Sequence, residues 1–96
     1  MSDHTAAALA KLELLAPILT ALPKTPDTEK VCDDMDALRR AVSAFHLEAI
    51  RFRMFNVERA LLRGGDTYPQ EAKDRFADLR KALEEAGFHT RSHAAP

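Results

Sequence analysis

Four polar residues in the middle of the chain could bind an anion or a partner's acidic group. Arg39, His46 and Arg53 follow one another at heptad intervals, and Asn56 lies close to the last of them. On one continuous helix, this spacing places the side chains inside an arc that is otherwise apolar. Arginine offers a planar fork of N–H donors to a carboxylate or phosphate, and histidine titrates near neutral pH. We therefore take Arg39, His46, Arg53 and Asn56 as the candidate binding residues.

The same row also has a structural interpretation. A buried arginine must be paired, because desolvating an isolated charge costs several kcal/mol. Acids of a second copy could pair with these arginines across a dimer seam, and Asn56 could fix the register of that seam. Docking on a partner protein is a third possibility, and the sequence leaves all three open.

No catalytic motif accompanies these residues. The chain has no glycine-rich phosphate loop, no nucleophile elbow and no paired catalytic carboxylates. Cys32 and His46 would lie about 21 Å apart along one helix, too far to act as nucleophile and base. We therefore expect no enzyme, no catalytic residue and no cofactor.

Two histidine-containing segments have a spacing that metal sites also use. His89 and His93 have the spacing of two ligands on one helix face, but they follow Gly87, which should end the last helix. Ser2-Asp3-His4 could hold Cu(II) or Ni(II) if Met1 were removed. Chance explains both patterns better, so we expect no metal site.

Prolines and glycines divide the chain into three expected helices. The first carries a leucine stripe, with Pro17 inside it predicting a kink or break. Thr25 should cap the second helix, with Pro26 in its first position. No glycine or proline intervenes from Pro26 to Arg63, which predicts one central helix of about 38 residues, or about 57 Å. Gly64-Gly65 should end it.

The third helix should begin near Thr67 and Gln70, which have capping-box spacing. Gly87 should end this helix, with Phe88 folding back on its apolar stripe. We expect residues 89–96 to form a flexible tail. The stripe comprises Ala72, Phe76, Leu79, Leu83 and Ala86.

The central helix would have two apolar seams, too wide an arc for two short helices to cover. The sequence therefore predicts an all-α fold in one domain, 1–96, as a bundle of three helices completed by homodimerisation. Acids dominate the start of the central helix and arginines its later part, which favours antiparallel packing. The first seam comprises Val31, Met35, Leu38, Val42, Phe45, Ala49 and Phe52, and the second Leu47, Ile50, Met54, Val57 and Leu61.

Composition limits the partners. The net charge is -1 in 96 residues, so no overall field favours nucleic acid or an anionic membrane, and no apolar run is long enough for a membrane span. One cysteine fits a reducing cytoplasm. We expect a non-enzymatic interaction or regulatory module that dimerises and docks on a larger protein through Phe55, Arg59 and Leu62. The alternative is a small-anion or ligand-binding protein that uses the Arg/His row.

Overall fold

The computed structural model describes residues 3–88, whose regular structure is entirely helical. The expected all-α class is therefore confirmed. Within the described residues there are four α-helices and one short 3-10 turn, where three helices were predicted. The elements are α1 (Asp3–Thr20), α2 (Pro26–Ser43), α3 (Leu47–Gly64), η1 (Gly65–Thr67) and α4 (Gln70–Glu85).

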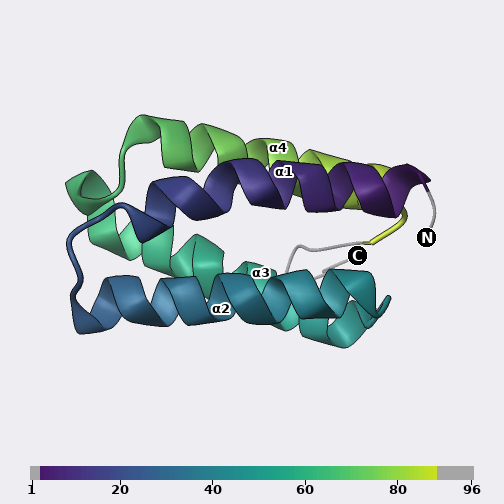
Figure 1. Ribbon diagram of the computed structural model, residues 1–96, viewed down its shortest axis with the longest axis horizontal. Helices are drawn as coiled ribbons and strands as arrows, with labels where there is room; N and C mark the ends of the chain where they lie inside the picture. The colour runs from purple at the N-terminus through teal and green to yellow at the C-terminus, as the bar shows by residue number, and fades with distance from the viewer. Residues whose placement is uncertain (1–2, 89–96) are drawn as a thin grey trace.

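The helices form two layers. One layer holds α1 and α4 side by side, and the other holds α2 and α3; α1 also packs against α2 (Figure 1). The core lies between the layers and receives fully buried side chains from all four helices. No helix of the described part is long and apolar enough to cross a membrane.

The predicted central helix over 26–63 is wrong, because the chain reverses after Ser43. Phe45 has a left-handed backbone, with φ of 58°. Its N–H donates to the Val42 carbonyl at 3.2 Å, and the N–H of His46 donates to the Ala41 carbonyl at 3.0 Å. These two bonds form a Schellman motif, which ends a helix. Neither a glycine nor a proline marks the reversal, which is why the sequence analysis missed it.

A contact between two aromatic rings accompanies the reversal at Phe45. The Phe45 ring lies 5.4 Å from the Phe88 ring, centroid to centroid. Phe88 itself follows the predicted glycine stop of α4. The N–H of Gly87 donates to the Glu84 carbonyl at 3.0 Å, and that of Phe88 to the Leu83 carbonyl at 2.9 Å. The expected Schellman end of α4 is thus confirmed, and the ends of α2 and α4 meet through two aromatic rings.

The reversal folds α2 back on α3 within one chain. The two seams predicted to need a second copy now face the protein's own core. Phe45, Leu47 and Phe52 are exceptions, since they are 52%, 40% and 56% exposed. Covering the seams therefore does not require a dimer. The buried seam residues are Val31, Met35, Leu38 and Val42 of α2, and Ile50, Met54, Val57 and Leu61 of α3.

Of the kink or break expected at Pro17, the break is wrong, because α1 continues through it to Thr20. Pro17 is exposed, while Leu15 and Leu19 on either side of it are buried in the core. Only the last turn of α1 lies beyond the proline. Packing of Leu19 holds that turn in place despite the missing backbone donor.

The other helix ends follow the sequence in part. Thr25 caps α2 and Pro26 occupies the first position, as expected. Thr28 completes a reciprocal capping box with Thr25, which was not predicted. The ending of α3 at Gly64-Gly65 is also confirmed. The predicted capping box of the last helix is wrong. Pro69 is the N-cap of α4, and its side chain has no acceptor to offer. Gln70 already lies in the helix and donates to Asp74.

Substitution of Gly64 tests the packing at the end of α3. Gly64 has a helical φ of −74°, so an alanine fits the backbone, but its Cβ would overlap the ring of Tyr68, which is only 3% exposed. We expect Gly64→Ala to lower the free energy of unfolding by about 1–3 kcal/mol, measured by urea denaturation. At a helical position with no ring against it, replacing glycine by alanine raises the free energy of unfolding by up to about 1 kcal/mol. A neutral or stabilising result would therefore contradict this packing.

Candidate functional site

The four predicted binding residues do not form one row, because the helix that was to align them ends at Ser43. Arg39 lies on α2 and binds Glu13 of α1, with Nη2–Oε1 and Nε–Oε1 distances of 2.7 and 2.9 Å. It also reaches Asp36 at 3.4 Å. His46 is an exposed N-cap of α3, where its Nδ1 accepts the Ala49 N–H at 3.3 Å.

Arg53 and Asn56 do come together, on a carboxylate that the sequence analysis missed. Asp34 of α2 accepts from Arg53 Nη1 at 2.8 Å and from Asn56 Nδ2 at 3.4 Å, both on its Oδ1. Its other oxygen accepts from Lys30 at 2.9 Å. The Asp34 side chain is 2% exposed. Acid–arginine pairing thus joins α2 to α3 inside one chain.

A sequence signal for Asp34 existed. It lies three residues after Val31 and four before Leu38, so it shares the buried face of α2. As one of the acids near the start of the expected central helix, Asp34 suited the helix dipole and was not among the predicted binding residues. A carboxylate on a buried face needs partners, and that requirement points to Arg53 and Asn56.

The charge of Asp34 is stabilised by its partners. Burial alone would raise the pKa of this carboxyl. Hydrogen bonds from Lys30, Arg53 and Asn56 outweigh burial and hold the pKa below its ordinary value. Asp34 is therefore ionised at neutral pH, and the Arg53 fork already holds a carboxylate.

A shallow cavity of about 220 Å³ adjoins this cluster, between α2 and α3. Its lining carries one more cation than anions, since Lys30, Arg59 and Arg63 face Asp27 and Asp34. A small anion could bind Arg59 and Arg63 here. The two acids would weaken such binding.

The three residues predicted as a partner surface share one face of α3. Phe55, Arg59 and Leu62 follow a three–four spacing, and Phe52 and Glu48 extend the row toward the N-terminus of the helix. We call these five residues the α3 outer face. The side chains that α3 buries lie on its opposite face. Phe52 is 56% and Leu62 76% exposed, which is unusual for a helix of this size.

Arginines lie over both aromatic rings of the α3 outer face. The guanidinium carbon of Arg59 is 5.5 Å from the centre of the Phe55 ring, and that of Arg53 is 5.0 Å from the centre of the Phe52 ring. Such cation–π contacts hold the rings in place. Phe52 is exposed, whereas Phe55 is partly buried. Phe52 was assigned to a buried seam in the sequence analysis, and its exposure corrects that assignment.

The α3 outer face borders a groove of about 240 Å³ between α3 and α4. The groove is mainly apolar, with Leu61, Leu62 and Phe76 in its lining, and Glu58 and Lys73 at its sides. A salt bridge from Arg80 of α4 to Glu58 of α3, at 2.8 Å, ties the two helices beside it. Leu62 belongs to both the groove and the α3 outer face.

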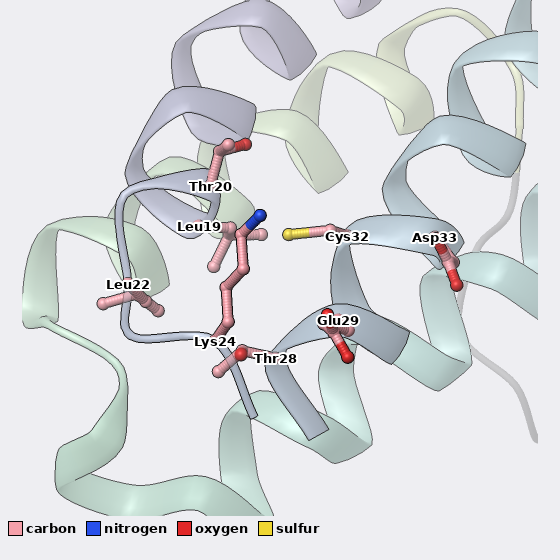
Figure 2. Close-up of a pocket in the computed structure, with 8 residues that line it drawn as sticks. All are labelled: Leu19, Thr20, Leu22, Lys24, Thr28, Glu29, Cys32 and Asp33. Carbon is pink, nitrogen blue, oxygen red and sulfur yellow. The ribbon is translucent and has the colours of Figure 1, made fainter. Parts of the chain in front are cut away.

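A cavity of about 430 Å³ lies where α1 ends and α2 begins (Figure 2). The Cys32 sulfur and the Lys24 amine point toward one another in it, as Figure 2 shows. Burial raises the pKa of the Cys32 thiol above its ordinary value of 9.0, helped by the nearby Asp36 and Asp33 and opposed by Thr20 and Lys24. The protonated thiol is a poor nucleophile at neutral pH.

Metal-binding residues do not cluster in the described part of the chain. No three His, Cys, Asp or Glu side chains among those described could hold a metal ion together. The segment Ser2-Asp3-His4 and the pair His89 and His93 fall on residues whose side chains the structure does not describe, as does the expected tail over 89–96.

Comparison with protein families, with curated proteins and with solved structures finds no match to this chain.

Replacing Asp34 tests the α2–α3 cluster. We expect Asp34→Ala to lower the free energy of unfolding by about 2 kcal/mol, because three side chains lose a shared acceptor. The exposed neighbour Asp33 provides the matched control. Asp33→Ala should change the free energy of unfolding by less than about 0.5 kcal/mol. Urea denaturation of both variants measures the difference, and equal effects would contradict the role given to Asp34.

The same cluster has a pH signature. The folded-state pKa of Asp34 is lowered, so its stabilisation is present above the unfolded pKa, about 3.9, and is lost as the pH falls through the folded value. The wild type should therefore lose more unfolding free energy than Asp34→Ala between about pH 6 and pH 2. Parallel pH profiles for the two proteins would contradict the cluster.

Proposed function

We propose that the protein is a non-enzymatic interaction module that binds a protein partner through the α3 outer face. The exposed apolar row itself carries this proposal. Phe52 and Leu62 are more than half exposed on a helix whose opposite face already fills the core. A helix needs only one apolar face to pack in a bundle, so the second face is available for binding.

The composition of the α3 outer face supports binding to another helix. Two phenylalanines and a leucine at three–four spacing suit knobs-into-holes packing, and arginine and aromatic residues are enriched at the energetic centres of protein interfaces. Arg59 favours a partner that presents an acidic group. The proposed compartment is the cytoplasm, where a single unpaired cysteine such as Cys32 is in keeping with reducing conditions.

The anion-binding alternative has less support. Arg53 and Asn56 already bind Asp34, and Arg39 binds Glu13 on another face of the molecule. His46 caps α3 away from them. A ligand that needed all four would have to break several of these contacts.

Site-specific photo-crosslinking tests the interaction proposal. A photoreactive side chain at Phe55, at the centre of the α3 outer face, should form adducts with another polypeptide in cells that make the protein. The same group at Lys81, exposed on α4, should not. Adducts at Phe55 should disappear when Arg59 and Leu62 are both replaced by serine, with the helical circular dichroism unchanged. Failure to form an adduct at Phe55, or equal adducts at Lys81, would contradict the proposal.

A further inference from the structure

The α3 outer face has a symmetric order of residues about its own centre. Glu48, Phe52, Phe55 and Arg59 follow one another at spacings of four, three and four. The spacing is the same when the row is read in reverse. Reversal exchanges the two outer residues, Glu48 and Arg59, and the two inner residues, Phe52 and Phe55. A surface with this property complements itself about a twofold axis.

We propose that a second copy of this chain docks antiparallel on the α3 outer face, with Glu48 opposite Arg59 and Phe52 opposite Phe55. This inference rests on the proposed interaction function and names its partner. The twofold axis passes between the two copies of α3, level with Arg53 and Met54, so each pair occurs twice. In this register each heptad a position of one helix faces a d position of the other, as in an antiparallel coiled coil.

Charge favours this partner and this orientation. Glu48 and Arg59 lie eleven residues apart, or about 16.5 Å along α3, so they cannot pair with each other inside one chain. Two antiparallel copies bring each glutamate to an arginine. A parallel pair would set Glu48 against Glu48 and Arg59 against Arg59, which costs energy through repulsion of like charges.

Apolar residues beyond the row extend the interface. Leu62 lies three residues after Arg59 and is 76% exposed. In the antiparallel pair it faces the start of the other copy's α3. There Phe45 and Leu47 are 52% and 40% exposed. The pairing therefore covers Phe52 and Leu62 and brings Leu62 level with Phe45 of the other copy.

The interface is short, so the dimer is expected to be weak. From Glu48 to Leu62 the contact runs about 21 Å along one helix. An interface of this length is at the small end for specific complexes, and dissociation in the micromolar range follows. Concentration dependence is therefore part of the prediction.

Charge reversal tests the pairing by analytical ultracentrifugation. Glu48→Arg and Arg59→Glu should each weaken dimerisation about tenfold, because each sets like charges together at two symmetric positions. An equimolar mixture of the two variants should recover wild-type affinity, since the mixed pair again opposes unlike charges at both positions. The double variant, which carries both changes in one chain, should recover wild-type affinity without mixing. Lys81→Glu on α4 serves as the control and should leave dimerisation unchanged.

Three outcomes overturn the inference. The wild type could stay monomeric up to about 1 mM, the single variants could dimerise as tightly as the wild type, or the mixture could be no tighter than its components. Circular dichroism on each variant shows that the fold is intact. None of these outcomes removes a photo-crosslink from Phe55 to a different protein, so the interaction proposal is tested separately.

Discussion

Reversal of the chain at Phe45 is the constraint on which the rest of the structure depends. A left-handed backbone at a non-glycine residue costs about 1 kcal/mol or more. Two Schellman hydrogen bonds, capping of α3 by His46 and ring packing between Phe45 and Phe88 offset that cost. The alternative is a continuous helix whose two apolar seams would be left largely uncovered by α1 and α4.

Folding α2 back on α3 determines where each polar group can act. It brings Asp34 onto Arg53 and Asn56, which fixes the two helices against each other through a buried charge. It also separates the residues that heptad spacing had placed in one row, since Arg39 and His46 now lie before and at the turn. The inner face of α3 fills the core, and the α3 outer face is left as the apolar surface that the interaction proposal uses.

Much of the helical pattern could be predicted from the sequence, because proline, glycine and threonine act locally. The cap at Thr25, the stop at Gly64-Gly65 and the fold-back of Phe88 depend on residues a few positions apart. The turn at Phe45 could not be predicted this way. Its stability comes from Phe88, distant in sequence, and from burial of seams on both flanking helices.

The candidate site could be predicted only in part for the same reason. Phe55, Arg59 and Leu62 share a helix face whether the helix is long or short, so their local spacing was sufficient. Phe52 was assigned to the core, and Asp34 was overlooked, because both assignments required knowing which helix lies alongside. Pairings between helices follow from the reversal, which carries no local sequence signal.

The distance between positions 30 and 63 tests the reversal most directly. Both Lys30 and Arg63 line the same cavity between α2 and α3, whereas on one continuous helix they would be about 50 Å apart. Spin labels at Lys30→Cys and Arg63→Cys, with Cys32→Ser, report this distance by pulsed electron paramagnetic resonance. Dilution with an excess of unlabelled protein removes distances between copies. A distance below about 25 Å is the result that the folded-back pair predicts, and one near 50 Å would contradict it.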